Sequence, residues 1–154
     1  MAGPILFFVP GDPKGQPRPR AFARKVGDKF QARVFDAGTA EGWKSQIAAV
    51  LREHVGAQVM AGAVRLSLDF VVRRPKAHFG TGKRSGQLRE SAPFWCTQRP
   101  DIDNYAKAVM DCITQAGGVW HDDAQVSVLQ VRKIFGERPG VAVSITEQTA
   151  TYEP

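Results

Sequence analysis

The sequence predicts a small α+β domain, built on a mixed β-sheet of about five strands with two principal helices. Two observations support this prediction. Apolar residues alternate with a period of two over 63–73 and 126–135, and they recur at helical spacing over 39–54 and 103–115. A chain of 154 residues with 43% hydrophobic content can bury one sizeable core, so we expect a single domain over 1–154.

The N-terminal part of the chain predicts two short strands separated by a loop. Pro4–Pro10 is an apolar run bounded by prolines, which is typical of a first strand. Residues 11–20 carry three prolines and two glycines, and we therefore expect an irregular loop there. Phe30–Phe35 has the composition of a second short strand.

The first helix is expected to start at a capping residue and to end at about His54. Asp36 and Thr39 are both candidate caps, because each has a side-chain oxygen that can accept a hydrogen bond from the first turn. The apolar side of this helix consists of Trp43, Ile47, Val50 and Leu51.

The middle of the chain predicts the clearest strand, followed by a long loop. Over Ala63–Arg73 the even-numbered residues from Val64 to Val72 are all apolar, which places them on one face of a strand. Residues 75–98 are basic and rich in glycine but have little periodicity. Loops of this length in a compact domain are usually functional or mobile.

The C-terminal part predicts a helix and two strands. An apolar stripe runs from about Asp103 to Gln115, and Gly117-Gly118 is expected to end this helix. Val126–Phe135 alternates again, and Val141–Thr146 supplies a last strand after the Pro139-Gly140 turn.

The charge distribution favours a polyanionic partner. The formal net charge is +6 and the pI is about 9.7. Two segments carry the excess: residues 1–35 have a surplus of +5 and residues 73–99 a surplus of +6, while the remainder nets −5. We expect basic loops over about 11–35 and 75–98 to contact nucleic acid; the alternative is that they are simply solvated basic loops. The candidate DNA contacts are Arg18, Arg20, Arg73, Arg74, Lys76, Lys83, Arg84 and Arg99.

Several classes of protein are disfavoured. Two cysteines, Cys96 and Cys112, do not make a disulfide framework, and no His or Cys cluster has zinc spacing. The apolar run Ile5–Val9 is too short for the core of a signal peptide, and no segment approaches the length of a membrane span. We therefore expect a cytoplasmic protein with no membrane partner.

The chemistry is concentrated in two acidic segments. Asp101 and Asp103 lie two residues apart at the start of the second predicted helix; Lys107 and Asp111 follow on the helix face of Asp103. Asp122-Asp123 comes after the Gly-Gly reversal and can return to the same end of the fold. Clustered carboxylates repel one another, and a hard cation such as Mg²⁺ compensates that repulsion.

Each acidic residue also has a purely structural interpretation. Asp103 suits a helix N-cap, Lys107 and Asp111 suit a surface ion pair, and Asp122-Asp123 suits a turn. The residues alone leave both interpretations open.

The ordered set resembles the RusA family of Holliday junction endonucleases, a family common in bacteriophages and prophages. The resemblance is carried by Asp101-Ile-Asp103-Asn104, by Lys107, and by Asp122-Asp123-Ala-Gln-Val126 with the Arg132-Lys133 strand. It covers roughly residues 99–135.

The resemblance implies metal ligands at Asp101, Asp103 and Asp123, with Lys107 as a catalytic cation. It also implies Mg²⁺ as the cofactor, with Mn²⁺ as a possible substitute, and a homodimer that cleaves four-way DNA junctions in the bacterial host. Gly117-Gly118-Val119 is one residue longer than the family pattern, so Asp122 is the alternative ligand to Asp123.

Three other functions stay open beside junction resolution. The first is a nuclease with a broader preference for flaps and other branched DNA. The second is a non-catalytic DNA-binding protein of the same fold, and the third is a basic structural protein whose carboxylates only cap and pair.

Overall fold

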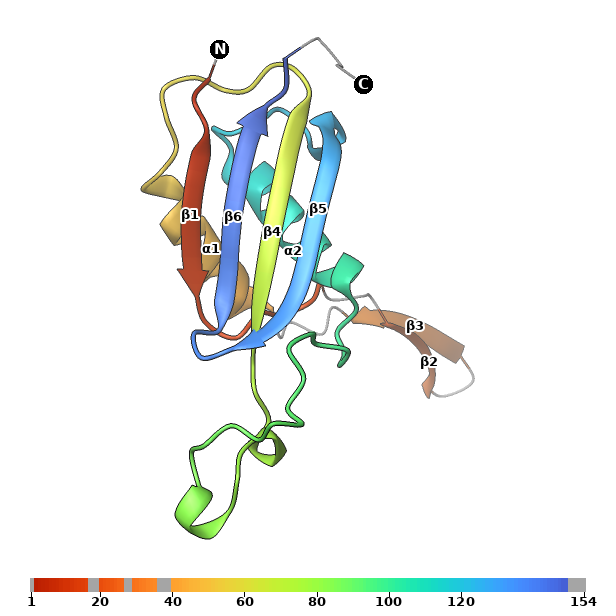
Figure 1. Cartoon of the computed structure of the whole chain (residues 1–154). Coiled ribbons are helices and arrows are strands. Elements are labelled where there is room, and N and C mark those ends of the chain that lie inside the picture. Colours follow the sequence, from red (N-terminus) through yellow and green to blue (C-terminus); the bar gives the residue numbers. More distant parts are fainter. Residues whose placement is uncertain (1, 17–19, 27–28, 36–39, 150–154) are drawn as a thin grey trace.

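The computed structural model describes residues 2–16, 20–26, 29–35 and 40–149, with the backbone alone for 20–26 and 29–35. It is an α+β structure in which two α-helices cover one face of a mixed β-sheet (Figure 1). The described strands are β1 (Ile5–Pro10), β2 (Arg20–Val26), β3 (Lys29–Phe35), β4 (Val64–Arg73), β5 (Val126–Gly136) and β6 (Gly140–Glu147). The α-helices are α1 (Glu41–Arg52) and α2 (Ile102–Ala116).

The main sheet has four strands in the order β1-β6-β4-β5. β6 is antiparallel to both of its neighbours, whereas β4 and β5 are parallel. A parallel pair requires a crossover connection, and here that connection includes α2. The residues between β4 and α2 form a long excursion beyond the end of the sheet (Figure 1).

The expected sheet of about five strands is therefore wrong by one strand. Phe30–Phe35 does form a strand, β3, but it pairs with β2 in a separate two-stranded sheet. The loop expected over 11–20 ends at its last residue, because Arg20 already begins β2 and pairs with Phe35. A hairpin of this kind satisfies its backbone hydrogen bonds locally, without joining the main sheet.

The core lies between the helices and one face of the sheet. Alternate residues of β1 and β4 are buried, as the period of two predicts. Trp43, Ile47 and Leu51 of α1 pack into this core, whereas Val50 is only partly buried. The opposite face of the sheet is left uncovered by either helix (Figure 1).

The helix boundaries agree with the predicted ones to within two residues. α1 ends at Arg52 rather than His54, and both predicted caps, Asp36 and Thr39, lie outside the described residues. α2 ends at Ala116, just before Gly117-Gly118, as the two glycines predict. The N–H of Gly117 donates to the carbonyl of Ile113, and the φ of Gly117 is +73°, a backbone conformation that glycine tolerates.

Two 3₁₀ turns, Lys76–His78 and Gly82–Arg84, lie in the long basic loop over 75–98. The loop then returns to the sheet and runs beside the end of β5. There the N–H of Cys96 donates to the carbonyl of Lys133 at 3.0 Å, and the N–H of Phe135 donates to the carbonyl of Phe94 at 2.9 Å. Among the described residues, no helix is long and apolar enough to cross a membrane.

Candidate functional site

The start of α2 presents two exposed carboxylates. Asp101 occupies the N-cap position, but its side chain makes no capping hydrogen bond. Asp103 lies in the first turn, where its Oδ1 accepts the N–H of Asn104 at 3.0 Å. The alternative interpretation of Asp103 as the N-cap is therefore wrong, because the helix begins at Ile102 and Asp101 occupies the N-cap position.

Lys133 of β5 holds the segment that precedes these carboxylates. Its Nζ donates to the carbonyl of Pro100 at 2.8 Å and also to the carbonyl of Gln98. The same Nζ lies 5.7 Å from the ring centroid of Tyr105, one turn into α2. Burial raises the pKa of Tyr105 to about 12, so the ring stays neutral beside the lysine. The sheet thus fixes the position at which α2 starts.

The middle of α2 carries the predicted ion pair. Lys107 Nζ lies 3.5 Å from Asp111 Oδ1, with the lysine side chain 61% exposed and the aspartate 21% exposed. A pair this exposed contributes less than about 1 kcal/mol to stability. The lysine therefore has room to contact a phosphate.

Asp122 caps a short 3₁₀ turn, Asp123–Gln125, that leads into β5. Its Oδ1 accepts the N–H of Ala124 at 2.9 Å, and Gln125 Oε1 accepts the N–H of Asp122 at 3.1 Å, which completes a capping box. The predicted turn is confirmed for Asp122. Asp122 is therefore engaged in the cap through its side chain.

Asp123 lies in a locally acidic environment. A hydrogen bond with Asp122 raises the pKa of Asp123, and burial and the charges of Asp122 and Asp111 raise it further, whereas Lys107 lowers it. The Ala124 amide and the hydrogen bond with Asp123 lower the pKa of Asp122. Asp123 therefore shares one environment with Lys107 and Asp111 on α2, and the carboxylates there outnumber the lysine.

The two acidic segments do not form a ready-made metal site in the described residues. Asp101 and Lys133 line the same hollow, whereas Asp123 precedes Val126, the first residue of β5. The stretch from Val126 to Lys133 spans about 23 Å of strand. No group of three or more Asp, Glu, His or Cys side chains in the described residues is placed to hold a metal ion. Asp122-Asp123 thus returns to α2 near Asp111 and Lys107, but the described carboxylates do not form a preassembled metal site.

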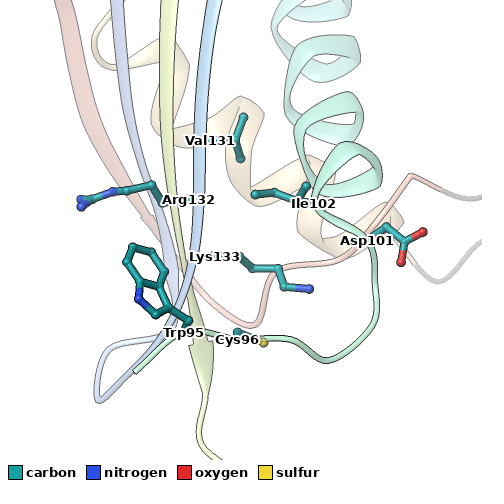
Figure 2. Close-up of a pocket in the computed structure, with 7 residues that line it drawn as sticks. All are labelled: Trp95, Cys96, Asp101, Ile102, Val131, Arg132 and Lys133. Atoms are coloured by element: carbon teal, nitrogen blue, oxygen red, sulfur yellow. The ribbon is translucent and has the colours of Figure 1, made fainter. Parts of the chain in front are cut away.

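A hollow of about 580 Å³ lies beside the start of α2 (Figure 2). It follows one edge of β5, and Asp101 and Ile102 come from the start of α2. The complete lining is Trp95, Cys96, Asp101, Ile102, Val131, Arg132 and Lys133. Sequence reasoning did not select Arg132 and Lys133 as site residues, although the Arg132-Lys133 pair follows the acidic segment on an alternating strand.

The predicted DNA-binding residues have different surroundings. Arg74 donates to the carbonyl of Pro93 at 2.7 Å and lies over the ring of Phe135, so it braces the long loop. Arg73 pairs with Asp12 at 3.0 Å in an exposed position. The exposed basic residues of the loop and the α2 approach are Lys76, Lys83, Arg84 and Arg99. Arg18 lies outside the described residues, and Arg20 is described by its backbone alone.

An α+β fold with a basic loop and with carboxylates both on α2 and just before β5 has the residue types that a phosphodiester-cleaving protein needs. Comparison with known families identifies the class. The model for "Endodeoxyribonuclease RusA" matches residues 10–146, and the chain therefore belongs to the RusA family of endodeoxyribonucleases. It is an enzyme that hydrolyses phosphodiester bonds within DNA.

Two relatives extend this comparison. The uncharacterized protein YqaN of Bacillus subtilis strain 168 is 33% identical over 147 residues, which covers 95% of this chain and 98% of YqaN. The crossover junction endodeoxyribonuclease rusA of Lactococcus phage r1t is 36% identical over 53 residues, which covers 34% of this chain and 40% of the phage protein. The fold and the catalytic class therefore rest on a match to most of the chain.

Proposed function

We propose that this protein is a Mg²⁺-dependent endonuclease that resolves four-way DNA junctions in the bacterial cytoplasm by paired phosphodiester hydrolysis. The observation that carries the proposal is the placement of exposed carboxylates at the start of α2 and beside Lys107 in a basic member of this family. The similarity to a phage crossover junction endodeoxyribonuclease supports the choice of substrate.

Asp101, Asp103 and Asp123 would hold the metal ion. Carboxylate oxygens are the ligands that Mg²⁺ prefers, and Mn²⁺ accepts the same ligands. The raised pKa of Asp123 indicates uncompensated negative charge there, which a cation would offset. When bound, the metal would activate a water molecule and reduce the charge on the scissile phosphate. Lys107 would add positive charge at that phosphate.

We propose that a homodimer completes the carboxylate set. A single chain does not gather these carboxylates into a metal site among the described residues, so Asp123 of a second copy would complete each site. A two-fold dimer also provides two sites, as the paired strands of a four-way junction require.

The long basic loop would bind the DNA arms. Lys76, Lys83 and Arg84 are exposed on this loop, and Arg99 is exposed two residues before Asp101. Arg74 would position the loop rather than contact phosphate, because its guanidinium is already engaged with Pro93 and Phe135.

A cleavage assay tests the proposal directly. The protein is incubated with a synthetic four-way junction, a flap, a replication fork and a linear duplex, with and without Mg²⁺. We expect symmetric nicks in the junction alone, and only with the metal. Equal cleavage of flaps and forks would establish a broader branched-DNA nuclease instead, and binding without cleavage in either Mg²⁺ or Mn²⁺ would refute the catalytic proposal.

A mixing experiment tests whether the site is shared between copies. Asp101→Asn and Asp123→Asn are each expected to abolish cleavage when assayed alone. Mixed and allowed to exchange subunits, they form heterodimers in which one of the two composite sites is intact, and nicking of one strand is expected to return. Persistent inactivity of a mixture shown to contain heterodimers would place all the ligands within one chain.

A further inference from the structure

Two neighbouring aromatic side chains are exposed where the long basic loop returns to the sheet. Phe94 is 53% exposed and Trp95 is 56% exposed. Their ring centroids lie 5.0 Å apart and the two rings are nearly perpendicular, at 84°. Tryptophan is highly buried on average, so an exposed aromatic pair indicates a surface that contacts a ligand.

The backbone of Trp95 is held firmly against β5. Two backbone hydrogen bonds, one on either side of Trp95, tie the loop to the strand at 2.9 and 3.0 Å. Between these bonds Trp95 lies opposite Ile134 in an antiparallel bridge. The next residue, Cys96, is buried. The indole is therefore presented from an anchored backbone, which lowers the entropic cost of binding a ligand.

Trp95 lies on the face of the sheet that the helices leave uncovered. Opposite residues of an antiparallel pair share a face, and so do alternate residues of a strand, which places Trp95, Ile134 and Arg132 on one face. Arg132 binds Asp69, which alternates with the buried residues of β4 and so points away from the core. Figure 2 shows the indole of Trp95 beside the Arg132 side chain. The indole is thus accessible to a large ligand.

The indole also lines the same hollow of about 580 Å³ as Asp101 (Figure 2). Both cations of this lining are already engaged. Arg132 donates to both carboxylate oxygens of Asp69, at 2.7 and 2.8 Å, and Lys133 donates to two backbone carbonyls. A phosphate group would have to displace these bonds, and the carboxylate of Asp101 would repel it. The rest of the lining is Trp95, Cys96, Ile102 and Val131. A flat, uncharged ring suits this hollow better than an anion does.

We propose that Trp95 stacks on a nucleobase at the branch point of the DNA, a role that rests on the proposed function. In a linear duplex each base is stacked between its neighbours, so its faces are closed to a protein ring. At a branch point the continuous stack is interrupted, and aromatic side chains bind the base faces that become available. Trp95 is therefore a residue that determines the preference for branched DNA over linear duplex.

The charges around the hollow match this ligand. Arg99 is exposed two residues before Asp101, and the long loop is basic, so the phosphates of the DNA can be bound outside the hollow while the hollow receives a base. Because Asp101 is a proposed metal ligand, a base held by Trp95 belongs to the stretch of DNA that carries the scissile phosphate.

Tryptophan fluorescence tests the contact in the unmodified protein. The chain has three tryptophans, and because Trp43 and Trp120 are buried, a quencher in solution reaches Trp95 first. The protein is titrated without divalent metal, against a synthetic four-way junction and a linear duplex of matched sequence. We expect the junction to quench the emission and to protect Trp95 from acrylamide, and the duplex to do neither. The Trp95→Phe variant should lack this response.

Binding affinity gives the second measurement. Trp95→Ala is expected to weaken junction binding by roughly 5- to 100-fold, the range that loss of one stacked base corresponds to. Its affinity for linear duplex should stay the same. Trp95→Phe keeps a ring and should recover most of the junction affinity. Phe8→Ala is the matched control, because Phe8 is an exposed aromatic residue of the same sheet at its opposite edge.

Three results would overturn the stacking role. The first is a junction that leaves the emission of Trp95 unchanged although it binds. The second is an equal loss of affinity for junction and linear duplex in Trp95→Ala. The third is wild-type junction affinity in a Trp95→Ala protein that circular dichroism shows to be folded, which would assign the aromatic pair to a protein partner instead.

Junction cleavage in Mg²⁺, measured on the same preparations, separates this inference from the proposed function. Cleavage of junctions by the wild-type protein and by Trp95→Ala with equal affinity would overturn the stacking role and leave the nuclease proposal standing. Specific quenching by the junction in a protein that cleaves no branched DNA would do the reverse.

Discussion

Lys133 and Pro100 join the last part of β5 to the start of α2 through a hydrogen bond of 2.8 Å from Nζ to the Pro100 carbonyl. Because the same Nζ also binds the carbonyl of Gln98, one lysine fixes the peptide groups that follow Gln98 and Pro100. The position of Asp101 in space is therefore set by the sheet as well as by its own helix.

Lys133→Met should lower both stability and activity. Hydrogen bonds to a charged group are worth about 1.5–3 kcal/mol. We expect the free energy of unfolding, measured by urea titration, to fall by about 1–3 kcal/mol. The cleavage rate should fall by more than the loss of folded protein explains, because the position of Asp101 is no longer fixed by Lys133. Lys44→Met, on α1, is the control for removal of a lysine. A loss of stability with unchanged cleavage would show that Asp101 does not depend on this anchor.

Lys107→Ala should abolish cleavage without unfolding the protein. The exposed pair with Asp111 contributes less than about 1 kcal/mol, so the melting temperature should change by only a few degrees. Arg52→Ala, at the exposed end of α1, serves as a matched loss of charge. Near-normal cleavage by Lys107→Ala would return this lysine to a purely structural role.

Cleavage should weaken on acidification at a pH above the ordinary range for an aspartate. The pKa of Asp123 is raised, so its carboxyl keeps a proton to higher pH, and protons compete with the metal there. Asp122→Asn removes the largest cause of the increase while its side-chain oxygen can still cap Ala124. The acid limb of the pH–rate profile should therefore move to lower pH.

Asp111→Asn is the matched control for the acid limb. Asp111 raises the pKa of Asp123 through charge alone, and less than Asp122 does. Its variant should shift the limb in the same direction by a smaller amount. If neither variant shifts the acid limb of the pH–rate profile, a group other than Asp123 controls the loss of cleavage at low pH.

Neutralising the loop should reduce the salt dependence of junction binding. Lys76, Lys83 and Arg84 are exposed, and each phosphate contact adds roughly 0.9 to the slope of log K against log salt on duplex DNA. The triple alanine variant should therefore lose about two to three units of slope in fluorescence anisotropy titrations. An unchanged slope would place this part of the loop away from the DNA.

Arg74→Ala should behave differently from the triple variant. Its guanidinium braces the loop against Pro93 and Phe135, so its loss should increase proteolysis of the loop and reduce affinity with little effect on the salt slope. A fall of about one unit in slope would show that Arg74 contacts phosphate directly.

Local periodicity predicted the elements better than their partners. The alternation in Val64–Val72 is a property of a strand with one buried face, so it was visible in the sequence, as was the glycine end of α2. The partner of Phe30–Phe35 was not, because β3 pairs with a strand that follows a proline-rich stretch and has no alternation of its own.

In the candidate site, too, local features could be predicted from the sequence and long-range contacts could not. The sequence identified the carboxylates and Lys107, and it predicted the Lys107–Asp111 pair because i,i+4 neighbours are set by helix geometry. It did not show that the described carboxylates form no ready-made metal site in one chain, because that depends on how α2 runs relative to β5. Likewise, the role of Arg74 depends on a long-range contact with Phe135 that no spacing encodes.

The order of the strands has a consequence for biosynthesis. β6 is the last of the described strands, yet it lies in the interior of the sheet and pairs with both β1 and β4. A nascent chain that has left the ribosome only as far as β5 has no strand to join β1 to the rest. Folding of the sheet must therefore wait for residues 140–147, and the nuclease cannot cut DNA while those residues are still inside the ribosome.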